Sequence, residues 1–250
     1  MNAWVKWCSM LLFVIMTGQS AADEIRVAVA ANFARPMQKI ATMYEIRSGD
    51  HVVLIVGGTG KFYTQIEAGA PYDVLLAADS ATPARLVAQG LASAESRFTY
   101  AKGKLVLWSA DPKRVDAQGA VLRQSSWKHL ALADPQLAPY GLAARQTLDH
   151  MGIHLAASRL VMGEDIGQTW QFVASGNAEL GFVAYSQILD KSGQVTGSYW
   201  RIPQRFYSPV RQDAVVLVAS RGRPSVNRLM AFLRSNPQAL QVISSYGYEH

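Results

Sequence analysis

Short apolar runs alternate with amphipathic stretches through the first hundred residues of the chain. Residues 25–31 form an apolar run typical of a buried strand, and Met37, Ile40 and Tyr44 then follow at helical spacing. The alternation goes on with strands expected at 51–56 and 73–78 and helices at 61–68 and 82–89. Strands that alternate with helices in this way predict a parallel sheet with crossover helices.

A second unit of the same kind follows a strand expected at 104–109. Its strands are expected at 129–133, 159–162 and 180–185, and its helices at 142–151 and 166–174. A late strand at 212–220 and two helices then close the chain. This order predicts an α/β protein of two lobes, in which the chain leaves the first lobe, builds the second and returns. Ligands of open α/β sheets bind beyond the carboxyl ends of strands, so the two lobes are expected to share one cleft.

The N-terminal segment has a different character. Lys6 is its only charge, an apolar run covers 10–16, and Ser20, Ala21 and Ala22 follow. This is the pattern of a secretory signal peptide cleaved near Ala22, and the run is shorter than the roughly 20 residues that span a bilayer. An uncleaved anchor is the alternative. The predicted division is therefore a signal peptide at 1–22, lobe one at 23–102 and 211–250, and lobe two at 103–210.

Composition narrows the range of partners. The chain has 24 Lys and Arg against 18 Asp and Glu, and this basic excess steers anions toward the protein. It contains no block of five or more Lys or Arg, so nucleic acid is not an expected partner. The only cysteine, Cys8, lies in the predicted signal peptide, so we expect neither disulfides nor cysteine-metal sites in the exported chain.

Three junctions between a strand and a helix offer groups that bind anions, at 30–33, 57–60 and 163–166. The start of a helix presents unpaired N–H groups and a partial positive charge. Asn32 and Thr59 add side-chain donors there, and the glycines of the second junction allow the backbone to approach a ligand closely. For any one junction alone, ordinary helix capping explains the same residues.

Signals for catalysis or for a bound metal are weak. Gly60-Lys61 does not complete a P-loop, because Ile55 and Phe62 occupy positions that the motif reserves for Gly and for Ser or Thr. The chain has no Gly-x-Ser-x-Gly elbow, and no spacing of its Ser, His and Asp residues indicates a triad. We therefore expect no catalytic residues, and a metal only in the form of an oxyanion.

At these junctions the sequence resembles the periplasmic molybdate-binding proteins of ABC importers. The resemblance covers residues 24–249. It is strongest in Val56-Gly-Gly-Thr-Gly-Lys-Phe-Tyr-Thr-Gln-Ile-Glu-Ala-Gly-Ala-Pro71. The match continues to Asp73 and to 77–79, and further matching segments lie at 30–33, 135–141, 163–166, 176–183, 208–213 and 245–248.

The resemblance implies a type II periplasmic binding protein fold, with mainly parallel sheets and an oxyanion held between the lobes by neutral donors. Carried over by motif, the ligand-binding residues are Asn32, Thr59, Tyr140 and Ile166, with Ala31, Gly58, Gly60 and Asp165 as secondary candidates. Many members have Ser in place of Asn32 and Thr59, and both replacements keep a donor. Some members place a tyrosine at the position of Ala184, whereas here the tyrosine is Tyr185.

The resemblance also implies capture without catalysis or a cofactor. The ligand would be molybdate or tungstate, and the closed protein would dock transiently on a membrane permease as a periplasmic monomer. Closure is expected about a hinge near 100–104 and 208–212. A carboxylate facing the ligand would favour a protonated oxyanion such as hydrogen phosphate, so Asp165 is expected to cap its own helix instead.

Three alternatives stay open at this point. The protein could bind another tetrahedral oxyanion, such as sulfate or phosphate. It could be an exported α/β hydrolase, which the missing nucleophile elbow disfavours. It could be the effector domain of a sensor or transcription regulator, which the export signal disfavours.

Overall fold

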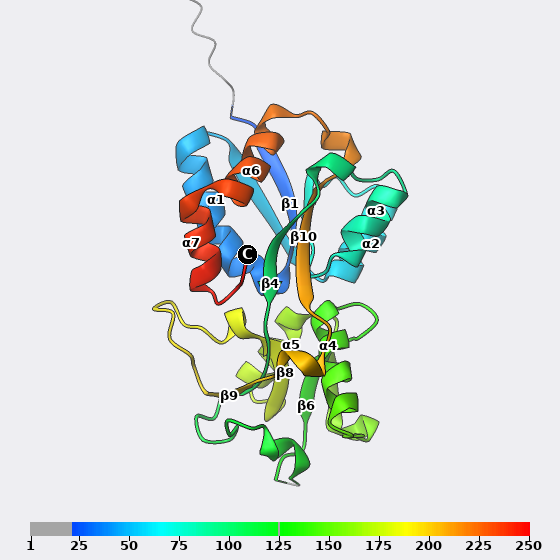
Figure 1. Ribbon diagram of the computed structural model, residues 1–250, viewed down its shortest axis with the longest axis vertical. Coiled ribbons are helices and arrows are strands. Elements are labelled where there is room, and N and C mark those ends of the chain that lie inside the picture. The colour runs from blue at the N-terminus through cyan, green and yellow to red at the C-terminus, as the bar shows by residue number, and fades with distance from the viewer. Residues whose placement is uncertain (1–21, 125) are drawn as a thin grey trace, which may run out of the picture.

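A computed structural model describes residues 22–124 and 126–250 and divides them between two five-stranded sheets with helices on both faces (Figure 1). The two-lobed α/β architecture is the one predicted. Except for Ala22, the predicted signal peptide lies outside the described residues. Across the two described ranges, no helix is both long enough and apolar enough to cross a membrane.

Lobe one is built on the strands β1 (Glu24–Ala30), β2 (His51–Gly57), β3 (Val74–Leu76), β4 (Phe98–Gly103) and β10 (Val210–Val216). In the order β2-β1-β3-β10-β4, the first three strands are parallel, and β10 runs antiparallel to β3 and β4. The helices of this lobe are α1 (Ala34–Ser48), α2 (Thr59–Glu67), α3 (Ala81–Ala88), α6 (Pro224–Ser235) and α7 (Pro237–Ser245). One face of the sheet is covered by α1, α6 and α7, and the other face is covered by α2 and α3 (Figure 1).

The apolar run of β1 follows from this burial on both faces. Val27 and Val29 pack with α1, α6 and α7, whereas Ala28 packs with Phe62 on the opposite side. Because side chains alternate across a strand, a strand buried on both faces needs apolar residues at every position. From Val27 to Ala30 the strand is therefore apolar at every position, whereas its first residues, Glu24 to Arg26, still alternate between exposed and buried.

Lobe two is built on the strands β5 (Leu105–Ser109), β6 (Leu130–Ala133), β7 (Leu160–Gly163), β8 (Leu180–Ala184) and β9 (Ser198–Arg201). In the order β7-β6-β8-β5-β9, the first three strands are parallel and the last two join antiparallel. Helix α4 (Pro139–His150) contributes to the core on one face, and α5 (Ile166–Ala174) contributes to the core on the other. In each sheet, three neighbouring strands are parallel, and the fourth strand in the order, β10 or β5, runs antiparallel to both of its neighbours.

The chain passes between the lobes twice. It leaves lobe one through Lys104, between β4 and β5, and it returns through 202–209, between β9 and β10 (Figure 1). The C-terminal tail runs beside the first passage, where Lys102 N–H donates to Glu249 O at 2.6 Å and Glu249 N–H donates to Lys102 O at 3.2 Å. The C-terminal tail therefore lies against the end of β4, where the chain first passes from lobe one to lobe two.

Candidate anion-binding site

The starts of four helical segments converge on a small cavity between the lobes. It is small and partly open to solvent. The four principal residues predicted from sequence all line it, namely Asn32, Thr59, Tyr140 and Ile166, as do Ala31, Gly58 and Asp165. The structure thus brings together side chains from four separate parts of the chain.

Asn32 lies in a short 3-10 turn, Ala31–Phe33, that follows β1, and only 2% of its surface is exposed. Its Nδ2 donates to Gln212 Oε1 and to Tyr248 Oη, at 2.9 Å in each case. Its backbone carbonyl accepts from Ser186 Oγ at 2.9 Å and from Tyr248 Oη at 2.8 Å. Among the described residues, Asn32 Oδ1 has no hydrogen-bond partner.

Thr59 is the first residue of α2, and it is as deeply buried as Asn32. Its Oγ1 accepts the N–H of Ala78 at 2.9 Å. A hydroxyl also carries one hydrogen, and within 22–124 and 126–250 no acceptor is present for it. The first intrahelical bond of α2 runs from Phe62 N–H to Gly58 O, which leaves the Thr59 N–H free as well. Thr59 therefore offers an anion two donors, one from the side chain and one from the backbone.

Tyr140 presents its backbone to the cavity and directs its side chain toward the place where the chain crosses between the lobes. Pro139 occupies the first position of α4, and the first intrahelical bond runs from Leu142 N–H to Ala138 O, so the N–H of Tyr140 is free. The phenol oxygen accepts from Gln212 Nε2 at 3.2 Å. A Cβ placed on Gly103 would lie 1.9 Å from this oxygen, so only glycine leaves room for the tyrosine there.

Ile166 is the first residue of α5, and the preceding Asp165 caps that helix. Asp165 Oδ1 accepts from the N–H groups of Gly167 and Gln168, at 2.7 and 3.0 Å. The expected capping role of Asp165 is therefore present. Its carboxylate binds the second and third N–H groups of the helix and leaves the N–H of Ile166 free.

Gly60 does not take the role suggested for it. Its N–H donates to the carbonyl oxygen of Leu137, across the two lobes, at 3.0 Å, and Gly60 does not line the cavity. A secondary ligand role therefore does not fit this residue. Gly58 lies at a second close contact, because a Cβ there would lie 3.1 Å from Asp165 Cβ. The two glycines let the lobes touch through their backbones.

The charges around the cavity limit how it could bind an anion. In the described part of the chain no Lys or Arg lines it, and the only charged residue that does is Asp165. Burial raises the pKa of Tyr140 well above its ordinary value, and burial raises that of Tyr248 to about 12. Both phenols are therefore neutral at physiological pH. Unpaired N–H groups and hydroxyls at helix starts are what remains to bind an anion here.

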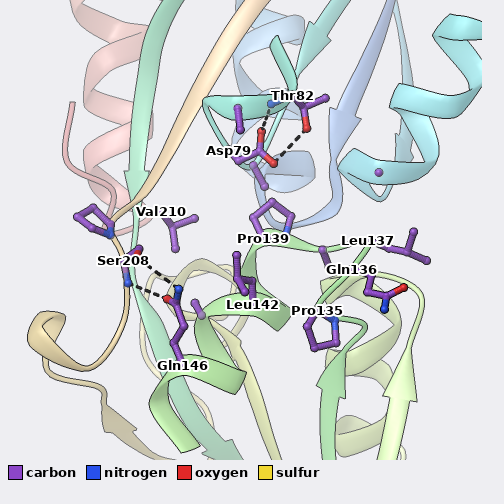
Figure 2. A pocket seen from close by; sticks show the side chains of 16 residues that line it. Asp79, Thr82, Pro135, Gln136, Leu137, Pro139, Leu142, Gln146, Ser208 and Val210 are labelled. Carbon is purple, nitrogen blue, oxygen red and sulfur yellow. Dashed lines mark hydrogen bonds between the residues drawn. The ribbon is translucent and has the colours of Figure 1, made fainter. Parts of the chain in front are cut away.

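A wider groove adjoins the cavity and shares Ala78, Ala138 and Pro139 with it. Figure 2 shows Asp79 and Thr82 on its lobe-one side and Pro139 and Leu142 on its lobe-two side. Asp79 accepts from the N–H and hydroxyl of Thr82, at 2.8 and 3.1 Å, and burial raises its pKa. The groove is the outer part of the cleft between the lobes, and it leads to the cavity.

The sequence did not identify the residues that hydrogen-bond the candidate ligand-binding residues, directly or through a neighbour, and hold them in place. They are Ala78, which bonds Thr59, and the buried side chains Tyr100, Ser186, Gln212 and Tyr248. The matching segments at 208–213 and 245–248 contain two of them, but a segment match assigns no role to a residue.

Tyr185 points away from the site. Its ring lies 5.8 Å from that of Tyr199 and 5.0 Å from the Arg201 guanidinium carbon, centroid distances that place it outside the cavity.

Comparisons with known proteins identify the family. Residues 25–249 match the profile of the family described as bacterial extracellular solute-binding protein. The chain is 52% identical to the molybdate-binding protein ModA of Azotobacter vinelandii, over 91% of this chain and 90% of that protein. It is 46% identical to ModA of Rhodobacter capsulatus, over 92% and 89%. The solved periplasmic molybdate-binding protein of A. vinelandii superposes with a TM-score of 0.88 at 40% identity, covering 90% of this chain and 99% of that one. The chain belongs to the bacterial extracellular solute-binding protein family, in the group that includes these molybdate-binding proteins.

Proposed function

We propose that this protein captures molybdate, and tungstate as its close analogue, for import by an ABC transporter. The observation that carries the proposal is a cavity at converging helix starts, lined by free neutral donors and by no Lys or Arg within the described ranges. Such donors replace the water around a dianion and place no fixed charge beside it. The high identity to two molybdate-binding proteins supports the same ligand.

The anion would be held by both lobes at once. Asn32 and Thr59 bind it from lobe one, and the N–H groups of Tyr140 and Ile166 bind it from lobe two. The lobes are proposed to consist of 23–102 with 211–250 and of 103–210, and to close about the two passages of the chain. Because a ligand bound by both lobes stabilises the closed form, capture and closure are one event.

The members of its family and its close relatives are binding proteins, and this protein is likewise a binding protein and not an enzyme. This sets aside the hydrolase alternative, and the oxyanion is a ligand that needs no cofactor. Family membership also places the protein in an ABC transport system outside the cytoplasm. We further propose that residues 1–22 are a signal peptide removed near Ala22, that the carrier is a periplasmic monomer, and that the closed form docks on its permease.

A panel of oxyanions tests the ligand assignment. Molybdate, tungstate, sulfate and phosphate are added to the protein that begins at Asp23, and thermal unfolding is followed. A ligand that binds only the folded protein raises the melting temperature, by RT ln(1 + [L]/Kd) in free energy. We expect large shifts with molybdate and tungstate and far smaller ones with sulfate and phosphate. Sulfate or phosphate binding as tightly as molybdate would reject the assignment in favour of the other oxyanion.

A further inference from the structure

Behind the cavity lies a buried network of side-chain amides and hydroxyls. Asn32 is linked to Gln212, and Gln212 is linked in turn to Tyr140 at 3.2 Å and to Tyr100 at 3.0 Å. Gln212 has no exposed surface, and the exposed fractions of Tyr100 and Tyr140 are 2% and 1%. Polar groups buried this deeply are costly unless each donor meets an acceptor.

Donors and acceptors do not match in the orientation described above. Asn32 Nδ2 uses both hydrogens on the network, and Oδ1 is the amide atom left for the cavity. The single hydrogen of Tyr100 faces two acceptors, Ala77 O at 2.9 Å and Gln212 Oε1. Within the described residues, the hydroxyl of Tyr140 donates no hydrogen bond of ordinary length, although the Tyr248 hydroxyl is near enough to interact with it. An amide oxygen facing the cavity would also repel an oxyanion.

A half-turn of both amides together removes these mismatches, because oxygen and nitrogen exchange places and the side chains keep their shape. Gln212 Nε2 then donates to Asn32 Oδ1 and to Tyr100, and Gln212 Oε1 accepts the hydrogen of Tyr140. The turn moves one mismatch to Tyr248, because the single hydrogen of its hydroxyl then faces two acceptors, Oδ1 and the carbonyl oxygen of Asn32. The amides must turn as a pair, because turning one alone would set like atoms face to face at 2.9 Å.

We propose that Gln212 is a positioning residue that holds the NH2 group of Asn32 toward the cavity, where it donates to the bound oxyanion. Gln212 does not line the cavity, so it acts through Asn32. Burial raises the pKa of Tyr100 and Tyr140, which keeps both phenols protonated, so each has one hydrogen to donate. Tyr100 donates its hydrogen to Ala77 O, which leaves its oxygen to accept from Gln212. This role rests on the proposed oxyanion function. Gln212 would decide whether the NH2 group or the oxygen of Asn32 faces the bound anion.

A double-mutant cycle tests the positioning role. Gln212→Met removes both polar groups of the amide and keeps a chain of similar length. Asn32→Ser gives the site a hydroxyl, which carries donor and acceptor on one atom and has no orientation for Gln212 to select. Molybdate affinity is measured by titration calorimetry in all four proteins, and the coupling isolates the interaction between the two positions.

We expect Gln212→Met to weaken molybdate binding by about tenfold when Asn32 is present and by less than about threefold in the Asn32→Ser background. Equal losses in both backgrounds, or no loss in either, would overturn the positioning role. Gln212→Leu, which also removes both polar groups of the amide and adds no charge, gives the same comparison if the methionine variant folds poorly. Failure of the unaltered protein to bind molybdate would reject the proposed function, whereas binding without coupling rejects the role of Gln212 alone.

Discussion

Gly60 donates its backbone N–H to the carbonyl oxygen of Leu137, and this 3.0 Å bond joins the two lobes beside the anion cavity. The lobes also approach each other closely at Gly167, where an added Cβ would lie 3.0 Å from the Cβ of Ala31. The lobes therefore touch through small residues and backbone atoms. Closure to this distance is what encloses the donors at the helix starts around a ligand.

Gly60→Ala is expected to weaken molybdate binding by an order of magnitude or more. Its Cβ would lie 2.7 Å from Leu137 O, and this oxygen belongs to the backbone and cannot move aside alone. Because the closed form carries the strain, release should be faster, and the melting temperature without ligand should change little. Stopped-flow fluorescence with molybdate gives the dissociation rate.

Lys61→Ala is the matched control for that variant. Lys61 is the exposed neighbour of Gly60 on α2, and it does not line the cavity. We expect its affinity for molybdate to stay within about twofold of the unaltered protein at physiological salt, where exposed charges are screened. A loss at Lys61 as large as that at Gly60 would point to cationic binding and against neutral dipoles.

Thr59→Ala should lower both affinity and stability. Thr59 Oγ1 accepts the N–H of Ala78, so alanine leaves a buried donor unpaired. Such a donor costs about 1–3 kcal/mol of folding stability. Thr59→Ser keeps the hydroxyl and should keep both properties. Urea unfolding without ligand and calorimetry with molybdate separate the two effects, and unchanged affinity in Thr59→Ala would remove Thr59 from the site.

Asp165 can be tested by a pair of substitutions that separate its cap from its charge. Asp165→Asn keeps an oxygen that accepts from Gly167 and Gln168, whereas Asp165→Ala removes it. We expect alanine to cost about 1 kcal/mol of stability and asparagine much less. If the carboxylate faced the ligand instead, Asp165→Asn would change the relative affinities for molybdate and phosphate. Measuring both anions on both variants decides between these roles.

Local pattern was enough to predict most of the fold. The apolar runs of β1, β6 and β8 are continuous because helices bury both faces of their sheets, and such runs are visible in one sequence. Strand β4 was not predicted, because its sequence Phe-Thr-Tyr-Ala-Lys-Gly mixes polar and apolar residues. It is held by β10 and by the C-terminal tail, and pairing between segments more than a hundred residues apart leaves no local signal.

The same limit applies to the site. Asn32 and Thr59 stand at helix starts, so local rules identified them as donors, and the family motifs added Tyr140 and Ile166. Gly60 was assigned to the ligand because the rule for helix starts does not say which N–H the opposite lobe takes. Gln212 reaches Asn32 across 180 residues, and only the fold places them together.

The last prediction concerns stability and pH at a buried ionic group far from the anion. Asp50 accepts from Tyr44 Oη at 2.6 Å and from Arg228 at 2.8 Å, and only 5% of its surface is exposed. Burial alone would raise the pKa of Asp50, but the hydrogen bonds from Tyr44 and Arg228 outweigh it and hold that pKa below the ordinary 3.8.

A lowered pKa means that the folded state binds the Asp50 proton less tightly than the unfolded chain does. The stabilisation is therefore complete above pH 3.8 and is lost as the pH falls through the lower pKa of the folded state. Asp50→Asn should lower the free energy of unfolding by about 2 kcal/mol at pH 7. The difference in unfolding free energy between this variant and the unaltered protein should shrink below pH 3.8. Urea unfolding at pH 7, 5 and 3 measures it, with the exposed Asp149→Asn as a control expected to show almost no gap. A gap for Asp50→Asn that stays constant down to pH 3 would show that the carboxylate does not contribute through its charge.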